Sequence, residues 1–380
     1  MNKYILVFNA GSSTLKFGLF HIDSKLELIG SGNFERIGLL NPFLEFNGKK
    51  TKYSKRINYS KALKIIVNKL DVEKSMIKVI GHRVVHGGNK FFKPTLVTKK
   101  VWKDISKFND LAPLHNHANL EVIKACYYIF PKVKNVAVFD TSFFQKLKPE
   151  YYLYAIPYEL FKNNGIRRYG FHGISHQLIA KEAAKKLKKP LNKINLITIH
   201  LGSGCSIVAI KKGVAIKTSL GFTPLDGLVM GTRSGDLDPS IPLYLQKKLN
   251  KSVAQVEEIL NKKSGLLGLS GFTSDMREIL KASGHKVIDY HGKTKFTPEQ
   301  KRRAKIALNV FITRLRTYIT LYTSFLHKVE AIVFTGGIGE RSPVIRKLST
   351  QNINFISKPK ILTIPSNEEK AIAEQVKNIV

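Results

Sequence analysis

The stretch FNAGSSTLKFGLF, residues 8–20, decides the fold class of this chain of 380 residues. It follows an apolar run at residues 4–7. After its glycine and serines, the order of apolar and other residues is closer to alternation than to a helical period. The pattern predicts two strands, residues 3–8 and 15–22, joined by a tight Gly-Ser-Ser turn. A P-loop needs the spacing G-x-x-x-x-G-K-S/T and a helix after it, and this stretch has neither. We therefore predict a hairpin turn.

A second stretch repeats this arrangement near the middle of the chain. In IHLGSGCSIVAIK, residues 199–211, Gly202 and Ser203 take the places that Gly11 and Ser12 hold in the first turn. The two stretches share few identities. A strand, a glycine-hydroxyl turn and a second strand, occurring twice, nevertheless form the pattern of a duplicated domain. Two such turns facing each other could hold the phosphates of a nucleotide with backbone N–H groups and hydroxyls.

Strands and helices alternate along the rest of the chain. Apolar runs predict further strands at residues 76–80, 133–139, 195–199, 206–210 and 331–335. Helical periodicity predicts helices at residues 116–130, 176–189, 253–262, 300–326 and 367–379. A capping box of Ser366 and Glu369 is expected to begin the last helix. This order predicts an α/β fold in two domains, residues 1–150 and 151–365, with the C-terminal segment 366–380 packed back on the first.

The charge of the chain is unusual. It has 63 Lys and Arg residues against 27 Asp and Glu, a net charge of +36, and such a field attracts polyanions such as RNA. The basic residues are spread along the sequence, and the densest cluster, residues 181–189, fits the solvated face of an amphipathic helix. We therefore favour a solvated basic surface, which would also attract a phosphorylated small substrate, over a nucleic-acid site.

The remaining composition indicates a folded protein. Apolar residues make up 43% of the chain. Two cysteines, Cys126 and Cys205, can form neither a disulfide framework nor a zinc site. The N-terminal residues lack the features of a signal peptide, and no apolar segment reaches membrane-spanning length. We expect a soluble cytoplasmic protein.

A third glycine-rich segment, residues 336–339, follows the predicted strand 331–335. Ser342 can cap, and Pro343 can start, the helix expected next. A glycine loop between a strand and a helix N-terminus suits the binding of an anion or a nucleotide.

Ten stretches span nearly the whole chain: FNAGSSTLKF (8–17), GHRVVHGG (81–88), LAPLHNHAN (111–119), VFDTSFF (138–144), RRYGFHGISH (167–176), IHLGSGCS (199–206), TPLDGLVMGTRSGDLDPS (223–240), GLSGFTSDMRE (268–278), FTGGIGERS (334–342) and SNEE (366–369). In this order they resemble the acetate kinase family, within the superfamily of acetate and sugar kinases, actins and heat-shock chaperone ATPases. The resemblance implies two duplicated actin-like (ribonuclease H-like) domains with a nucleotide cleft between them. It also implies reversible, Mg²⁺-dependent phosphoryl transfer between ATP with acetate and ADP with acetyl phosphate, by direct in-line transfer.

The resemblance implies a set of catalytic residues. Arg83 would bind the substrate carboxylate or acyl phosphate with its planar fork, and Arg233 and His172 would stabilise the phosphoryl group in transfer. Asp140 matches a residue treated in the family as an acid/base. Acetate has no proton to lose near neutral pH, so we expect Asp140 to orient Arg83 or a magnesium-bound water. His115 is expected to contact the substrate.

The substrate pocket, the metal and the nucleotide site follow from the same resemblance. The acetate pocket would be walled by Val85, Leu114, Phe171 and Pro224. Mg²⁺, with Mn²⁺ as an alternative, would be held by Asn9 and Glu368 and would keep several waters. ATP or ADP would contact Ser12, Thr14, Lys16, His200, Leu201, Gly202, Ser203, Gly204, Asp275, Met276, Arg277, Gly337, Ile338, Gly339, Glu340 and Arg341. The implied partners are these small molecules and a second copy in a homodimer.

Some features depart from the family pattern. Ser203 and Arg341 stand where the family typically has asparagine, which leaves the nucleotide preference open, and residues 283–297 read as an inserted surface loop. A propionate or butyrate kinase of the same fold is the close alternative. A non-catalytic nucleotide-binding protein or an RNA-binding protein is the rival from another class, and neither accounts for the two arginines and the histidine inside their specific blocks.

Overall fold

The computed structural model describes residues 3–23, 26–109, 113–287 and 290–379, with the side chains of residues 113–115 outside the description. The chain forms two compact units. Unit 1 comprises Met1–Gln145, Phe171–Leu178 and Asn367–Val380, and unit 2 comprises Lys146–Gly170 and Ile179–Ser366. The chain therefore leaves unit 1 near the expected boundary at residue 150, and it returns for one short segment that sequence reasoning did not foresee.

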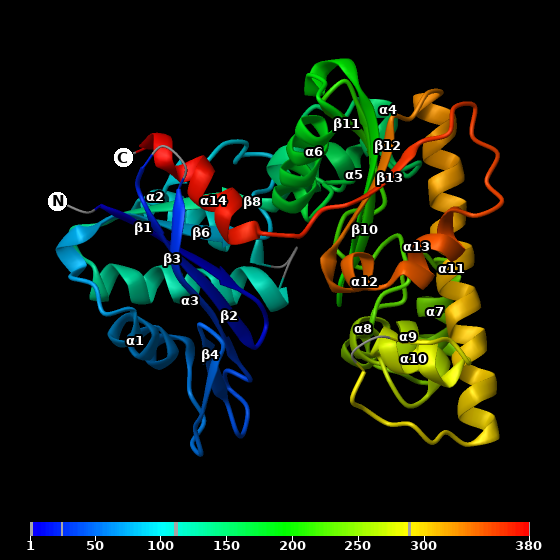
Figure 1. The fold of residues 1–380 in the computed structure, drawn as a ribbon, viewed down its shortest axis with the longest axis horizontal. Helices are drawn as coiled ribbons and strands as arrows, with labels where there is room; N and C mark the ends of the chain where they lie inside the picture. The colour runs from blue at the N-terminus through cyan, green and yellow to red at the C-terminus, as the bar shows by residue number, and fades with distance from the viewer. Residues whose placement is uncertain (1–2, 24–25, 110–112, 288–289, 380) are drawn as a thin grey trace. The chain divides into compact units, whose positions relative to one another are not determined.

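Unit 1 is built on a mixed sheet with the strand order β5-β4-β3-β2-β1-β6-β8-β7 (Figure 1). Its strands are β1 (Tyr4–Ala10), β2 (Thr14–His21), β3 (Glu27–Glu35), β4 (Phe43–Phe46), β5 (Lys49–Lys52), β6 (Ile77–Val84), β7 (Thr95–Leu96) and β8 (Lys134–Phe139). β1 and β2 form the predicted antiparallel hairpin, with Ala10 opposite Leu15. The turn is closed by a hydrogen bond from the Gly11 N–H to the Thr14 carbonyl oxygen, 2.9 Å.

Unit 2 is built on a second mixed sheet, in the order β11-β10-β9-β12-β13. Its strands are β9 (Asn195–Leu201), β10 (Cys205–Lys211), β11 (Val214–Thr218), β12 (Ala331–Thr335) and β13 (Lys360–Thr363). The five strands match β3-β2-β1-β6-β8 of unit 1 in order, and the successive pairings are antiparallel, antiparallel, parallel and parallel in both sheets. The topology confirms the α/β fold class. The same order of five strands in both sheets is the duplication that the two hairpin turns predict.

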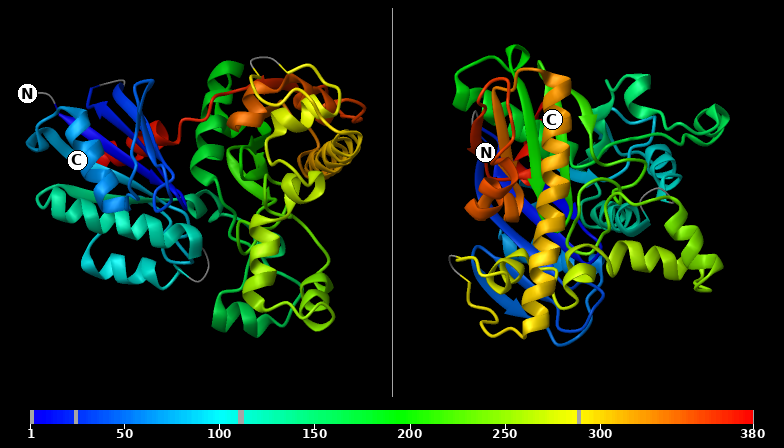
Figure 2. Two further views of the ribbon diagram at one scale, coloured as in Figure 1. Left: turned by 90° about the horizontal axis from the view of Figure 1, so that it is seen from below. Right: turned by 90° about the vertical axis from the view of Figure 1, so that its right-hand side faces the viewer.

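The described helices surround the sheets. They are α1 (Tyr59–Leu70), α2 (Lys99–Ser106), α3 (Pro113–Ile129), α4 (Pro149–Tyr152), α5 (Tyr158–Asn164), α6 (Gly173–Leu187), α7 (Ser240–Lys247), α8 (Val253–Lys262), α9 (Gly265–Ser270), α10 (Met276–Ala282), α11 (Pro298–Leu326), α12 (Gly336–Arg341), α13 (Pro343–Thr350) and α14 (Glu368–Val376). The predicted long helix at 300–326 is α11, and a capping box of Thr297 and Gln300 begins it. α11 packs along β9 and β10 of unit 2, as the right view of Figure 2 shows.

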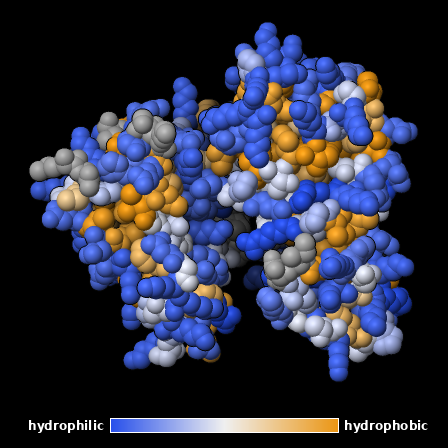
Figure 3. Space-filling model, viewed as in Figure 1, coloured by the Kyte–Doolittle hydropathy of each residue, from blue (hydrophilic) through white to orange (hydrophobic). Residues whose placement is uncertain are grey.

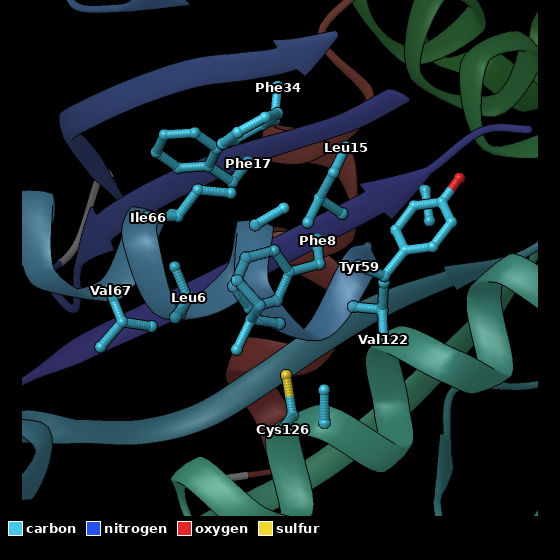
Figure 4. Packing of buried hydrophobic residues seen from close by; sticks show 14 of the residues in the cluster. Leu6, Phe8, Leu15, Phe17, Phe34, Tyr59, Ile66, Val67, Val122 and Cys126 are labelled. Atoms are coloured by element: carbon cyan, nitrogen blue, oxygen red, sulfur yellow. The ribbon is translucent and has the colours of Figure 1, made fainter. Parts of the chain in front are cut away.

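Helices cover both faces of the unit 1 sheet. Alternate side chains of β1 and β2, such as Leu6, Phe8 and Phe17, pack against Ile66 of α1 and Val122 of α3 on one face (Figure 4). The intervening side chains pack against α14 and the first turn of α6 on the other face. The C-terminal helix is therefore part of the layer that covers the first sheet, and its first turn lies beside β1 and β6.

Two local predictions need correction. α14 is capped by Asn367, whose side chain accepts from the Lys370 N–H, 2.9 Å, and not by Ser366 with Glu369. The predicted glycine loop at 336–339 is the first turn of the short helix α12. Gly336 has φ +78°, and a Cβ on it would lie 2.6 Å from the Leu201 carbonyl oxygen, so the turn requires glycine there. Ser342 and Pro343 do begin α13, as predicted.

The surface is mainly polar. Figure 3 shows hydrophilic residues over most of the face in view, with apolar residues in smaller groups. Among the described helices, none combines the length and the apolar character that crossing a membrane requires. Exposed apolar side chains lie on α7, at the start of α8 and in the connection between them: Ile241, Leu243, Tyr244, Leu249 and Val253.

Candidate active site

Three neighbouring parallel strands of unit 1 end at polar residues. β1, β6 and β8 lie side by side, and Asn9, Arg83 and Asp140 stand at or just after their carboxyl ends. Because the carboxyl ends of parallel strands meet at one edge of a sheet, these three side chains come together. Asp140 directly follows β8, which was predicted as the strand at residues 133–139, and it is part of this arrangement.

Arg83 is the centre of the cluster. Its Nη2 donates to Asp140 Oδ2 at 2.6 Å, its Nε lies 3.2 Å from both oxygens of that carboxylate, and its Nη1 donates to Asn9 Oδ1 at 3.1 Å. Nη1 also lies 3.4 Å from Glu368 Oε2. Two carboxylates therefore surround a guanidinium whose side chain is 16% exposed. Burial alone would lower the pKa of Arg83, but these carboxylates outweigh it and raise the pKa, so Arg83 stays charged.

Asp140 lies fully inside unit 1, with an exposed fraction of 0%. Burial raises the pKa of its carboxyl above the usual range, although the charge of Arg83 and a hydrogen bond from the His172 backbone N–H oppose the rise. Arg83 donates hydrogen bonds to both oxygens of this carboxylate. The arrangement suits a group that fixes the guanidinium, as the sequence reasoning expected.

His172 reaches this cluster because the chain returns to unit 1 at residue 171. It has φ +56°, in the left-handed region that few non-glycine residues adopt, and it immediately precedes α6. A Cβ on the next residue, Gly173, would lie 2.0 Å from the carbonyl oxygen of Asp140. Only glycine therefore permits the start of α6 to approach the end of β8, and this close approach places the His172 backbone next to Asp140.

The candidate metal ligands Asn9 and Glu368 lie beside Nη1 of Arg83. Asn9 Nδ2 donates to Glu368 Oε2 at 2.9 Å and to Glu369 Oε1 at 3.0 Å. Among the described residues, no group of three or more His, Cys, Asp or Glu side chains is arranged to hold a metal by itself. The amide of Asn9 on β1 and the two carboxylates in the first turn of α14 are nevertheless oxygen ligands of the kind that Mg²⁺ takes when it keeps several waters. The donor set fits that ion, and sequence reasoning missed Glu369 as part of it.

The predicted acetate-pocket residues are divided between the units. Val85 and Phe171 are buried in unit 1, and Phe171 meets the ring of His86 edge-on at 5.4 Å between centroids. Pro224 belongs to unit 2. The side chains of Leu114 and His115 lie outside the described residues. Sequence reasoning also missed two buried asparagines three residues apart on α3, Asn116 and Asn119, which accept from the backbone N–H groups of His86 and Val85.

Unit 2 carries the second hairpin turn, between β9 and β10. The Gly202 N–H donates to the Gly204 carbonyl oxygen at 3.0 Å, and the exposed Ser203 uses its carbonyl oxygen to accept from the Gly231 N–H at 3.1 Å. Leu201 is fully buried. A nucleotide at this turn would therefore meet the backbone of Leu201 and not its side chain. His200 is half-buried at the end of β9.

The other predicted nucleotide segments occupy two helix starts of unit 2. Asp275 caps α10 and forms a bidentate ion pair with Arg277, with Nη2 and Oδ2 2.6 Å apart. Between them Met276 is buried, 3% exposed, so its side chain belongs to the core. Glu340 accepts from the backbone N–H groups of Gly336 and Ser366, at 2.9 and 2.8 Å, and so ties the start of α12 to the segment that follows β13. Gly337 and Arg341 are exposed on that helix, Ile338 is half-buried and Gly339 is buried.

In unit 1, the remaining predicted nucleotide contacts surround the first turn. Ser12 and Lys16 are exposed, Thr14 is half-buried, and Lys16 lies directly opposite Asn9 across the β1–β2 pair. In unit 2, Arg233 lies in an irregular segment before α7, where its Nη1 donates to the Pro224 carbonyl oxygen at 2.6 Å. The structure thus brings together Asn9, Arg83, Asp140, His172 and Glu368 within unit 1.

Comparison with known proteins gives matches over nearly the whole chain. The model of the acetokinase family matches residues 4–358. An acetate kinase of Halothermothrix orenii is 40% identical over 99% of both chains, and one of Clostridium novyi is 42% identical over 99% of this chain and 98% of its own.

Among solved structures, an acetate kinase of Porphyromonas gingivalis has a TM-score of 0.86 at 34% identity, covering 99% of both chains. A propionate kinase of Francisella tularensis has a TM-score of 0.88 at 39% identity, covering 100% of both. On the full-length match in sequence and structure, this chain belongs to the acetokinase family.

Proposed function

We propose that this chain is the enzyme that transfers a phosphoryl group between ATP and acetate, giving ADP and acetyl phosphate, in either direction. The full-length similarity to acetate kinases at about 40% identity carries the proposal. In the forward direction a carboxylate oxygen of acetate forms a bond to the γ-phosphorus, and the bond from that phosphorus to the ADP oxygen breaks. The transferred group carries spread negative charge, so positioning and electrostatic stabilisation are the main tasks of the protein.

Arg83 is the substrate-binding residue of this proposal. It is fixed by Asp140 on one side and by Asn9 and Glu368 on the other, so little conformational freedom is lost when it binds an anion. Asp140 occupies the Nε and Nη2 edge of the planar fork of Arg83, so a carboxylate or an acyl phosphate would bind at the edge formed by Nη1 and Nη2. Asp140 holds this guanidinium and takes no proton from acetate, which is already ionised near neutral pH.

Magnesium belongs to the proposal as well. Asn9 and Glu368, with Glu369 beside them, are the residues that would hold it, since their oxygens form a set that Mg²⁺ accepts together with waters. When bound, Mg²⁺ neutralises part of the phosphate charge. His172 and Arg233 would donate to the oxygens of the transferred group. The proposal requires Arg83 and Arg233 to act on one phosphoryl group in the working enzyme.

Acetate is the proposed substrate. The similarity to the propionate kinase of Francisella tularensis supports propionate as the alternative. Val85 and Phe171 would form part of the wall that limits chain length. One methylene changes the discrimination in an apolar pocket by about 1–3 kcal/mol. Comparison of kcat/KM for acetate, propionate and butyrate distinguishes the two. Acetate should give the highest value, and a higher value for propionate would assign the chain to the alternative.

We also propose that the enzyme forms a homodimer in the cytoplasm, where ATP is abundant. The exposed apolar side chains of α7 and the start of α8, which include Leu243 at 53% and Val253 at 70% exposure, are the surface on which we place the contact. Sedimentation of the purified protein should give twice the chain mass. Leu243→Asp should shift it toward the monomer, and a monomer in the unmodified protein would contradict the proposal.

The activity itself has a direct test. Purified protein with acetate, ATP and Mg²⁺ should produce acetyl phosphate, detected as the hydroxamate. Arg83→Ala should lose most of this activity. The exposed ion-pair variant Lys90→Ala, in the same unit, should keep it. Absence of product from the unmodified enzyme with acetate, propionate and butyrate would refute the proposed function.

A further inference from the structure

The segment of unit 2 that carries Arg233 is closed at its base by one pair of residues. The Gly227 N–H donates to Asp236 Oδ1 at 2.7 Å, and the Asp236 N–H donates to the Gly227 carbonyl oxygen at 3.0 Å. Residues 227–236 therefore form a loop, named here the arginine loop. Its two ends are joined through both the backbone and the side chain of Asp236.

The backbone at this base has little room to change. Gly227 has φ +95° and Gly235 has φ +70°, so both occupy the region that favours glycine. A Cβ on Gly235 would lie 2.5 Å from the carbonyl oxygens of Gly227 and Leu228. The two ends of the loop are packed backbone against backbone, and a small shift of Asp236 must move the loop.

Helix α11 fixes Asp236 from outside the loop. Tyr318 donates its hydroxyl to Asp236 Oδ2 at 2.8 Å, and Arg314 Nη1 lies 3.0 Å from the same oxygen. Arg314 also donates to the carbonyl oxygens of Gly227 and Asp236, at 3.2 Å each. Because α11 packs on the central sheet of unit 2, it provides a rigid reference for the base of the loop.

A second carboxylate, that of Asp226, lies at the base of the arginine loop. Asp226 lies 3.1 Å from Arg168 Nη1, and its Oδ1 accepts from the Gly227 N–H at 3.0 Å. Burial and the neighbouring Asp236 raise the pKa of Asp226 to about 6. Two carboxylates and two guanidiniums thus meet at the base of the arginine loop. Three tyrosines face the same groups: Tyr154, Tyr318 and Tyr322.

The far side of the arginine loop is also held, by backbone contacts. The Ser264 N–H donates to the Thr232 carbonyl oxygen at 3.0 Å, and the Met230 N–H donates to the Arg233 carbonyl oxygen at 3.2 Å. The Gly231 N–H donates to Ser203 in the β9–β10 turn at 3.1 Å. The backbone of Arg233 is therefore fixed between α11 at one end and the turn proposed to hold the nucleotide at the other.

From this geometry we propose that Asp236 is a positioning residue for Arg233: tied to α11 by Arg314 and Tyr318, it closes the arginine loop and aims the Arg233 guanidinium at the phosphoryl group. The inference rests on the proposed function, because it needs Arg233 to act on that group. Asp236 itself touches neither substrate nor nucleotide in this account.

The test is a double-mutant cycle with Asp236→Asn and Arg233→Ala in the full-length enzyme. The asparagine keeps an acceptor for the Gly227 N–H and removes the charge that faces Arg314. We expect kcat to fall roughly ten- to a hundredfold, with KM for ATP and acetate changed by less than about threefold. In the Arg233→Ala background, Asp236→Asn should lower kcat by less than about twofold, because the guanidinium that Asp236 positions is already absent. Tyr318→Phe, which removes only one hydroxyl, should show a smaller loss of kcat with the same dependence on Arg233.

Leu308→Ala is the matched control, since Leu308 is a buried apolar residue of the same helix and carries no polar group that could bond to Asp236. It should lower Tm without a comparable loss of kcat. If Asp236→Asn lowers kcat by the same factor in the presence and in the absence of Arg233, the inference is overturned. The same holds if Leu308→Ala, at an equally lowered Tm, loses as much kcat as Asp236→Asn. If Asp236→Asn does not fold, Tyr318→Phe decides by the same criterion. A loss below about tenfold for Arg233→Ala alone would instead refute the proposed role of Arg233, and with it the inference.

Discussion

Replacement of Asp140 by asparagine separates an orienting role for this residue from a proton-transfer role. The carboxylate is fully buried and accepts from Arg83 through Nη2 at 2.6 Å and through Nε at 3.2 Å. Asparagine keeps the shape but presents one N–H₂ group to a guanidinium that cannot accept. Hydrogen bonds to charged groups contribute about 1.5–3 kcal/mol. If that energy aims Arg83, kcat/KM should fall by roughly ten- to a hundredfold.

The assay is hydroxamate detection of acetyl phosphate, from mildly acidic to mildly alkaline pH. The ratio of variant to unmodified activity should be the same at every pH, because acetate brings no proton to transfer. Asp140→Ala should also destabilise the protein by about 3–5 kcal/mol, the cost of removing one partner of a buried ion pair. Asp104→Asn, at an exposed ion pair with Lys90, is the control and should match the unmodified enzyme. Loss of one limb of the pH profile in Asp140→Asn, with a fall of about 10⁴-fold, would refute the reasoning and assign Asp140 a proton-transfer role.

Three further outcomes follow from individual contacts. Arg233→Ala is expected to lower kcat by more than about a hundredfold, the scale for a lost transition-state donor, and steady-state kinetics with a loss under about tenfold would exclude that role. Gly173→Ala places a Cβ 2.0 Å from the Asp140 carbonyl oxygen, so Tm and kcat should fall together, and an unchanged Tm would contradict the packing of α6 on β8. Burial lowers the pKa of His82 from 6.5 to about 4, so the folded protein holds this imidazole neutral while the unfolded chain protonates it below about pH 6.5. The free energy of unfolding should therefore be highest above about pH 6.5 and should fall by about 3 kcal/mol as the pH drops toward 4. Urea denaturation should show that loss in the unmodified protein and a smaller one in His82→Gln, and equal losses would contradict this origin.

The strands and the hairpins could be predicted from the sequence because their signals are local. Apolar runs bounded by glycine or charged residues locate β1, β8, β9 and β12, and a turn of three small residues fixes the pairing of the strands beside it. The place of Asp140 at a strand end follows from the same local reading. The roles expected for Arg83, His172, Arg233 and Glu368 came instead from the resemblance of their motifs to a known family.

Other features depend on contacts between distant segments and leave no local trace. Residues 171–178 pack in unit 1 although the chain around them belongs to unit 2, because Gly173 fits against the end of β8. Glu369 reads in sequence as a capping residue, yet its carboxylate meets Asn9, which is 360 positions away. Asn367 caps α14 instead, and the two glutamates that follow it both accept from the side chain of Asn9. Local capping rules could not anticipate this tertiary competition.

The duplicated sheets show how one topology came to serve two chemical roles. In unit 1 the ends of the central parallel strands carry Arg83 and Asp140 beside Asn9, a set of side chains that can hold an anion and a cation. At the matching place in unit 2, Thr335 pairs with His200, and glycines follow on both strands. Those positions carry a turn and a helix start in place of charged side chains, and proteins often bind phosphate oxygens at backbone segments of these two kinds. The same strand order therefore carries charged and amide side chains at the strand ends of one unit and glycine-rich backbone at those of the other, so unit 2 must bring its charged group, Arg233, from a loop outside the sheet.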